Sequence, residues 1–403
     1  MTDNRRNLVI LFFTMVVVMM GFGMVIPILP FFIIEFGAGG SAMGFLMASY
    51  AIMQFIFSPI WGTVSDRIGR KPVLMIGVLG FGLTQLLFGF SSALWMLLAS
   101  RLLAGILSSA TLPTAMAYIG DSTSERDRGG GMGIIGAAMG VGMVLGPGIA
   151  GWMAAYSLSL PFFFAAGLSL VSLILIFLLL PESLPPEKRE SGGGKIQGPQ
   201  LKELWQALFT PIGLLLLMSF LVSFGLTNFE IIFGLYAVET HGYGPQQVGG
   251  LLTFIGIISA IVQGGLTGPF TRRWGEATII KASLLGSALG FALMVMAQSL
   301  LAVLLTMGFF IISNAMLRPA VSALISRRAT IGQGVAMGLN NSFMSLGRSV
   351  GPLWAGFAYD FNSTYPYWSG ALIMLVGFII SMRRLKSDPA QGPIEQEIAP
   401  IHE

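Results

Sequence analysis

The chain has 403 residues, of which 54% are hydrophobic and only 10% are charged. This composition excludes a soluble domain of that size and indicates a protein built into a membrane. The chain has no cysteine, which excludes disulfides and thiolate metal sites, and its net charge of +4 is better explained by where the cations lie than by nucleic-acid binding.

Twelve windows of about 20 apolar residues predict twelve transmembrane helices. The windows cover about residues 8–34, 42–64, 72–92, 94–120, 129–153, 161–180, 211–238, 246–267, 282–298, 299–325, 333–357 and 366–382. The first window follows Arg5 and Arg6, as the apolar core of a signal peptide does. It is too long for a signal peptide, contains Pro27 and Pro30, and lacks a small-residue cleavage site, so we expect it to remain in the protein.

The 22 Lys and Arg residues predict how these helices are oriented. All but Arg101, Arg318 and Arg348 lie at the N-terminus, in loops that join an even to an odd helix, in the central linker or in the C-terminal tail. The positive-inside rule therefore predicts that both termini lie in the cytoplasm. We expect an N-terminal six-helix bundle at 1–183, a cytoplasmic linker at 184–208, a C-terminal six-helix bundle at 209–383 and a cytoplasmic tail at 384–403.

The predicted fifth helix is rich in glycine, which a soluble helix avoids because each one costs about 1 kcal/mol. It reads GIIGAAMGVGMVLGPGIAG, and its marked residues are Gly133, Gly136, Gly140, Gly142, Gly146, Pro147 and Gly151. Two smooth faces result, which suit close helix packing in a membrane. The second half repeats the pattern at Gly338, Gly347, Gly351, Pro352 and Gly356. This duplication predicts an all-α membrane protein with twelve transmembrane helices in two pseudo-symmetric six-helix bundles, the plan of major facilitator transporters.

A second motif lies in the predicted cytoplasmic loop between helices two and three. Its residues are Gly62, Asp66, Arg67, Gly69, Arg70 and Lys71. A plain surface turn needs the cations but not Asp66 or the two glycines. Asp66 could face the N-terminus of a helix from the other half, where the dipole favours an anion, and Arg70 could pair with Asp121. We interpret this group, with Asp121, as a latch between the halves that opens when they rock.

These motifs resemble those of the major facilitator superfamily, and the likeness runs over about residues 8–383. The segment 62–71 resembles its signature loop, and 133–151 resembles the helix-five motif of its drug/proton antiporters, with Ala150 in place of one glycine. The segment 21–30 resembles a motif of the twelve-span subgroup, and Arg101 with Gly105 matches the family's helix-four arginine. The chain is similar to bacterial multidrug efflux pumps of the NorA and Bmr type.

Glu230 is the acidic residue that we place deep in a predicted helix, where an ionisable group is functional by default. It shares a helix face with Ser223, Thr227 and Gly234, which suits a water-filled cavity. The resemblance aligns its segment with one that carries a functional glutamate. A structural role as partner of Arg348 or Arg318 is the alternative, and both roles can hold at once.

Other polar residues in the predicted helices extend this site. Arginine keeps its proton, so Arg101, Arg318 and Arg348 could tune a carboxylate but not carry the proton themselves; for the last two, structural hydrogen bonding is the alternative. The resemblance implies pocket positions at Gln54 and Asn340, and Asn314 stands where relatives have an aspartate. Val18 replaces the acid of tetracycline exporters, which disfavours tetracycline as a substrate.

The sequence thus predicts a secondary transporter that exports amphipathic drugs in exchange for protons, without a cofactor. We expect a monomer in the bacterial cytoplasmic membrane that binds small molecules, protons and lipid but no nucleic acid. A proton-coupled transporter of one endogenous metabolite or organic anion is the alternative, because three arginines against one deep acid suit an anion. No nucleophile–base pair or metal-ligand pattern indicates an enzyme.

Overall fold

The structure is a computed structural model that describes residues 2–189 and 201–385. In these ranges it is helical and contains no strand. Two stretches lie outside the described residues: 190–200 in the predicted linker and 386–403 in the predicted tail.

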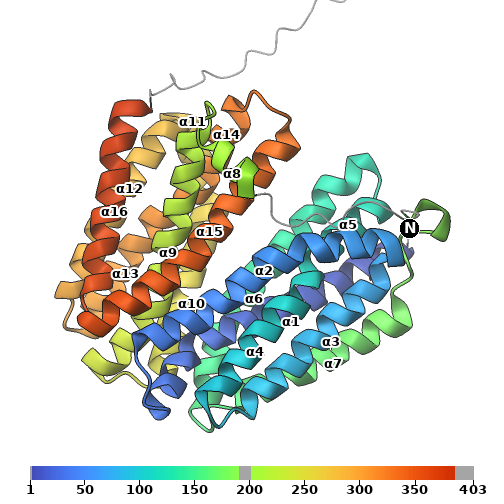
Figure 1. The fold of residues 1–403 in the computed structure, drawn as a ribbon, viewed down its shortest axis with the longest axis horizontal. Coiled ribbons are helices and arrows are strands. Elements are labelled where there is room, and N and C mark those ends of the chain that lie inside the picture. Colours follow the sequence, from blue (N-terminus) through green and yellow to red (C-terminus); the bar gives the residue numbers. More distant parts are fainter. Residues whose placement is uncertain (1, 190–200, 386–403) are drawn as a thin grey trace, which may run out of the picture.

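The first half of the chain forms six membrane crossings, which are drawn in blue to green in Figure 1. Its helices are α1 (Thr2–Glu35), α2 (Gly40–Ile68), α3 (Arg70–Gly89), α4 (Leu94–Leu107), η1 (Ser108–Ala110), α5 (Thr111–Ser122), α6 (Glu125–Ala154) and α7 (Leu160–Leu179). Together α4, η1 and α5 form one crossing with a tightened turn in its middle. A short turn, η2 (Pro186–Lys188), follows α7.

The second half repeats this arrangement. Its helices are α8 (Leu201–Ala207), α9 (Gly213–His241), α10 (Pro245–Ile261), η3 (Val262–Leu266), α11 (Thr267–Trp274), α12 (Glu276–Met296), α13 (Leu300–Ala315), α14 (Leu317–Arg328), α15 (Gln333–Phe361) and α16 (Tyr365–Arg384). One crossing consists of α10, η3 and α11, with a π-helical turn at η3, and another consists of α13 and α14. Each predicted window therefore falls on one crossing, and α8 precedes the second set.

Eleven of the twelve crossings are long and apolar enough to span a membrane by composition alone. The remaining one, α15, has the length but carries Asn340, Asn341, Ser345 and Arg348 in its middle. It packs along α9 and α2, which are both among the eleven. A polar helix enclosed in this way can span a membrane because its neighbours, not lipid, surround its polar groups.

Glycines of the helix-five motif pack this helix against the first helix of the same half. A Cβ added at Gly142 would lie 2.7 Å from the Val16 carbonyl oxygen, and one at Gly146 would lie 2.5 Å from that of Met20, both on α1. The repeat does the same in the second half, where Gly347 and Gly351 of α15 approach α9. One smooth face of each motif therefore holds its own bundle together.

The other smooth face joins the two halves. A Cβ at Gly151 of α6 would lie 2.5 Å from the Pro245 carbonyl oxygen and 3.0 Å from the Gly249 Cα, both on α10. At the matching position in the repeat, Gly356 of α15 lies against Gly40 and Gly44 of α2. These contacts lie at the predicted outer ends of the four helices, where the two bundles meet in Figure 1.

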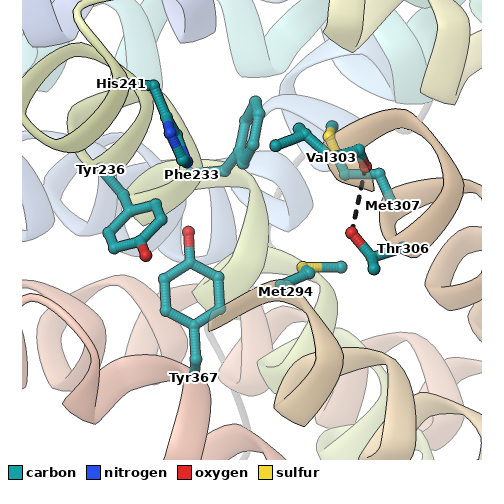
Figure 2. A pocket seen from close by; sticks show the side chains of 8 residues that line it. All are labelled: Phe233, Tyr236, His241, Met294, Val303, Thr306, Met307 and Tyr367. Carbon is teal, nitrogen blue, oxygen red and sulfur yellow. Dashed lines mark hydrogen bonds between the residues drawn. The ribbon is translucent and has the colours of Figure 1, made fainter. Parts of the chain in front are cut away.

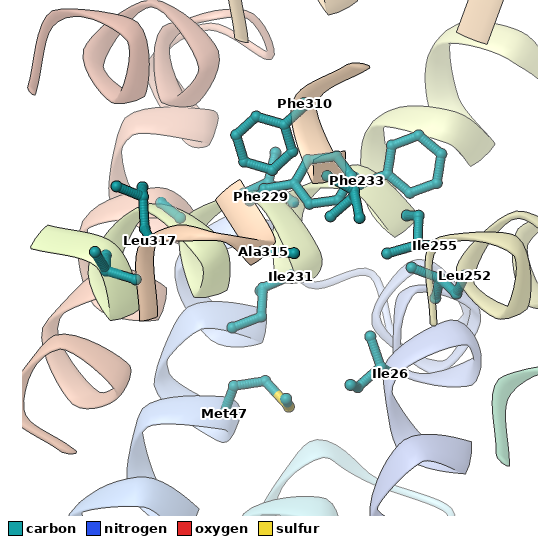
Figure 3. Close-up of a cluster of buried hydrophobic side chains, with 14 of the residues drawn as sticks. Ile26, Met47, Phe229, Ile231, Phe233, Leu252, Ile255, Phe310, Ala315 and Leu317 are labelled. Atoms are coloured by element: carbon teal, nitrogen blue, oxygen red, sulfur yellow. The ribbon is translucent and has the colours of Figure 1, made fainter. Parts of the chain in front are cut away.

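The bundles separate toward the predicted cytoplasmic side. A Cβ at Gly133, Gly136 or Gly140 of α6 would meet nothing within 4 Å, and the same is true at Gly264 of η3. The largest cluster of buried apolar residues includes both halves, whereas a second cluster, at the predicted cytoplasmic end of the first half, draws only on that half. Figure 3 shows Ile26 and Met47 of the first half beside Ile231, Leu252 and Ile255 of the second. The structure is closed at the predicted outer end and open at the other.

Candidate transport site

Glu230 lies half-buried in the middle of α9, and Gly234, one turn further along the same helix, lies against Pro30 of α1 in the other half. The charge of Glu230 interacts with that of Arg348 on α15, and Arg348 interacts in turn with Arg318 on α14 and with Tyr50 on α2 of the other half. Neither arginine is within the 4.0 Å of an ion pair with Glu230 among the residues that the structure describes. The carboxylate is therefore close to positive charge but leaves room between them for a proton, water or a ligand.

The two arginines are exposed, although they lie deep in the helices. Arg348 donates a hydrogen bond of 3.2 Å to the Ser345 hydroxyl one turn away on its own helix. Arg348 is close enough to Glu230 of its own half and to Tyr50 of the other half for their charges to interact, which places its exposed side chain between the two bundles. The second half therefore presents net positive charge to the opening, on the side opposite α2.

Tyr50 links these arginines to Arg101, and no pattern in the sequence marks it as a site residue. The Arg101 guanidinium lies between the rings of Tyr50 and Phe88, 5.3 Å from each centroid. The Tyr50 hydroxyl accepts a hydrogen bond of 3.3 Å from the Gln54 side-chain nitrogen. The predicted pocket residue Gln54 therefore orients a ring that contacts one membrane arginine and faces another.

Arg101 itself is only 2% exposed, and two of its nitrogens, Nε and Nη1, have no hydrogen-bond partner in the described part of the protein. Burying guanidinium donors without partners is costly, and stacking between aromatic rings offsets part of that cost. Buried polar groups without a partner are rare in folded proteins, so Arg101 is a candidate functional group.

The two asparagines of the predicted site differ. Asn340 on α15 accepts a hydrogen bond from the Ser219 hydroxyl and donates one of 3.1 Å to the Ser322 hydroxyl, so its amide joins three helices of the second half. Asn314 at the end of α13 is buried, and its amide nitrogen has no partner among the described residues. Asn314 therefore retains a donor for a ligand or water, whereas Asn340 is engaged within its own bundle.

The predicted latch is assembled within the first half. Arg70 lies 2.5 Å from an Asp66 carboxylate oxygen and 2.8 Å from one of Asp121, and it also donates to the Ser65 hydroxyl. Asp66 pairs with Arg70 in this structure, and its contact with a helix of the other half stays a prediction for the state in which the halves meet at this end. Asp66 remains 41% exposed and open to a second partner.

Glu182, just after α7, completes this cluster and was missed from sequence. Its carboxylate accepts hydrogen bonds from the backbone N–H groups of Arg70 (2.9 Å) and Lys71 (3.2 Å) at the start of α3. An anion at a helix N-terminus is favourable. Gly69 makes this approach possible, since its φ of +108° suits only glycine and a Cβ there would collide with the Glu182 carboxylate.

A separate cavity lies near the predicted outer end of the second half, between α9, α12, α13 and α16 (Figure 2). Tyr236, Tyr367 and His241 line it, and the Tyr367 hydroxyl has no partner among the described residues. Its volume is about 10 Å³, the space of one water molecule. It is therefore too small for a substrate, and the opening between the halves remains the candidate site.

Two six-helix bundles around a polar opening are the arrangement of a membrane transporter. A family model described as the Major Facilitator Superfamily matches residues 11–317 and 265–401. The chain is 32% identical over 392 residues to Multidrug resistance protein 2 of Bacillus subtilis (96% of this chain and 98% of the relative), and 31% identical over 378 residues to the quinolone resistance protein NorA of Staphylococcus aureus (93% and 96%). A solved structure of the nucleoside transporter NupG (D323A mutant) superposes with a TM-score of 0.78 at 14% identity, covering 94% of this chain and all of that one.

The protein belongs to the Major Facilitator Superfamily. It is a multi-pass membrane transporter of small molecules with the twelve-crossing fold predicted from its duplicated glycine pattern.

Proposed function

We propose that the protein exports amphipathic drugs, cationic or zwitterionic, in exchange for protons. The relatives named above are multidrug and quinolone resistance proteins that match over nearly the full chain, which supports drug export. The proposal includes a bacterial cytoplasmic membrane, cytoplasmic termini, a monomer and no cofactor, with the proton gradient as the energy source.

The observation that carries proton coupling is the position of Glu230. Of the acidic residues in the described ranges, it alone lies in the middle of a crossing, within reach of the charge of Arg348 and one turn from Gly234, which lies against the other half. A gradient can shift a conformational equilibrium only through a group that binds the proton differently in the two states. Glu230 meets this condition because the opening exposes it to one side of the membrane at a time.

In the proposed cycle, an outer proton binds Glu230 and releases the drug outward. The carrier, now protonated at Glu230 and without drug, returns to the inward-open state that the structure resembles. There Glu230 loses the proton and binds the next drug. Arg348, Arg318 and Arg101 set the charge around this exchange and hold water, while Gln54 and Asn314 supply polar contacts to the drug. Glu230 serves both proton and drug, so the two compete.

The latch residues act in the outward-open state, when the halves are closed on the cytoplasmic side. Asp66 is exposed on the open cytoplasmic side. When the halves close there, Asp66 would meet a helix N-terminus of the second half, as the helix dipole favours. Arg70 and Asp121 hold Asp66 in position through both states.

The test compares Glu230→Gln with Glu239→Gln in proteoliposomes that carry an imposed pH gradient. Ethidium serves as a permanent cation and a fluoroquinolone as a zwitterion, and internal pH is recorded together with drug uptake. We expect Glu230→Gln to lose uptake against a drug gradient while keeping downhill movement. Glu239 lies at the exposed end of the same helix, and glutamine keeps the oxygen that accepts the 2.6 Å hydrogen bond from the Tyr359 hydroxyl, so this variant should transport as the wild type does.

Proton-driven accumulation by Glu230→Gln at the wild-type stoichiometry would contradict the mechanism, and Asp66 and Asp121 would then be the next acids to test. Uptake that fails equally in both variants would indicate damage to α9 and not loss of a proton site.

The alternative function is proton-coupled transport of an organic anion or of one metabolite. The exposure of both Arg348 and Arg318 in the opening favours it, because their charges outnumber that of Glu230. Saturable uptake of an anionic dye with no competition by ethidium would support this alternative. Competition between ethidium and protons supports drug export.

A further inference from the structure

We propose that Asp360 stabilises the outer-closed state by capping the N-terminus of α2 across the two halves. Asp360 lies one turn beyond the Gly356 contact, in the last turn of α15 of the second half. This inference rests on the alternating-access transport proposed above and assigns one of the groups that balance its two states.

Asp360 makes two hydrogen bonds to the other half. One carboxylate oxygen accepts from the Gly40 backbone N–H at 2.6 Å, and the other accepts from the Ser41 backbone N–H at 2.9 Å. The two donors belong to the first two residues of α2. The carboxylate therefore binds the helix start with both oxygens, as a side-chain cap does.

The sequence of α2 leaves this cap vacant. The N-cap residue is Gly39, which has an extended backbone (φ −106°, ψ −169°) and no side chain to accept a hydrogen bond. The first N–H groups of a helix have no partner within the helix, and the dipole favours an anion beside them. Gly39 also permits the approach, since a Cβ there would lie 2.6 Å from the Asp360 carboxylate.

The internal repeat shows that this contact is not a general consequence of the fold. The counterpart of α2 is α10, whose start is stabilised locally: it begins with Pro245, which has no N–H, and the Gln247 side chain accepts a hydrogen bond of 3.0 Å from the Gly244 backbone N–H. The residue that follows Gly151 as Asp360 follows Gly356 is Ala155, which has no acceptor in its side chain. The packing of glycines is the same on both sides of the molecule, but the cap joins the halves only at α2 and α15.

Because only α2 is capped by the other half, the cap favours one of the two conformations. When the outer face opens, α2 and α15 separate there, and the N–H groups of Gly40 and Ser41 pass from a carboxylate to water. The cap therefore favours the closed outer face and adds nothing to the open one. Losing a side-chain cap typically costs about 0.5–2 kcal/mol, which corresponds to an increase of about twofold to about thirtyfold in the ratio of outer-open to outer-closed molecules.

The test measures this ratio from distances between pairs of spin labels. The chain has no cysteine, so each pair can be introduced without a background. Labels at Ser92 and Gln298 report on the predicted outer side, and labels at Gly129 and Thr330 report on the predicted cytoplasmic side. All four positions are exposed, and each pair has one member in each half.

Two variants remove the cap from opposite sides. Asp360→Ala removes the acceptor, and Ser41→Pro removes one donor without touching Asp360. Proline is compatible with this site because the chain itself has Pro161 and Pro366 at the second position of α7 and α16. Both variants should lengthen the outer distance and shorten the cytoplasmic one, and their effects should not add, since they break the same contact.

Glu35→Gln is the matched control. Glu35 is an exposed acid at the same predicted outer face, at the end of α1, so the substitution removes the same charge away from the cap. Wild-type distances in both Asp360→Ala and Ser41→Pro would overturn the proposal. A shift of the same size in Glu35→Gln would also overturn it, because surface charge alone would then explain the effect.

The distances are recorded in detergent without drug or pH gradient, so they do not depend on what is transported. If the proposed drug/proton exchange fails but the distances shift, the cap stands for another substrate. If exchange holds and the distances do not shift, only the cap is wrong.

Discussion

Two glycines of α6 lie at different interfaces, so the contact between the halves and the contact within one half can be tested separately. Gly151 lies against α10 of the second half, and Gly146 lies against α1 of the first. In both cases the nearest atoms are backbone: the Pro245 carbonyl oxygen at 2.5 Å from an added Cβ in one, and the Met20 carbonyl oxygen at 2.5 Å in the other. The same substitution to valine therefore meets the same steric resistance at two different interfaces.

The expected consequences differ in kind. Overpacking typically costs about 1–3 kcal/mol. At Gly151 this cost falls only on the outer-closed state, because α6 and α10 part there when the outer face opens. A bias of that size changes the ratio of outer-open to outer-closed molecules by about 5-fold to about 150-fold. At Gly146 the cost falls on both states, since α1 and α6 move together, so the ratio stays and the folded bundle becomes less stable.

The assay combines the outer and cytoplasmic label pairs with thermal unfolding. Gly151→Val should lengthen the outer distance with a small change in unfolding temperature, and Gly146→Val should lower the unfolding temperature with unchanged distances. The repeat supplies a second pair, Gly356→Val and Gly351→Val, which should behave in the same way. Equal distance shifts in both members of a pair would refute the assignment of the two faces.

Three further substitutions test the remaining parts of the site. Asp66→Asn should abolish transport while the protein stays folded, because Arg70 keeps its contacts with Asp121 and Ser65; wild-type exchange by the purified variant would remove the latch. Gly69→Ala should lower thermal stability by about 1–3 kcal/mol, since it forces alanine to positive φ and displaces Glu182; unchanged unfolding would refute this account. Arg101→Lys should lose transport at normal membrane expression, because a lysine retains the charge but not the planar group between Tyr50 and Phe88; wild-type uptake would mean that charge alone suffices.

The number and position of the crossings could be predicted because lipid requires long apolar segments, and the chain has few charges to interrupt them. The exception is instructive. The helix α15 is more polar than the other crossings and does not qualify by composition alone; residues 333–357 were predicted as an apolar window, and the glycine pattern that repeats that of α6 predicts the same crossing independently.

The site residues could be predicted only where the residues close by in the sequence indicate their role. The Arg70–Asp121 pair was foreseen because a loop with an unexplained acid and glycines needs a charged partner nearby. Glu182 was missed because it reaches the start of α3 from a segment after α7, and nothing in its own neighbourhood marks it. Tyr50 was missed because one aromatic ring in an apolar helix has no distinguishing pattern, and its role arises from Arg101 and Arg348 on other helices.

The repeat also separates what the fold requires from what transport requires. The contacts of Gly142 with Val16 and Met19 correspond to those of Gly347 with Phe220 and Ser223, and this register matches Glu230 with Ile26. Packing is therefore duplicated, but the acid is not: its counterpart is an apolar residue that closes the boundary between the halves. A charge that only stabilised a bundle would serve either half equally well. Glu230 with its facing arginines in one half, and Asp66 and Arg101 in the other, instead place unlike groups on the two surfaces that separate and meet during transport.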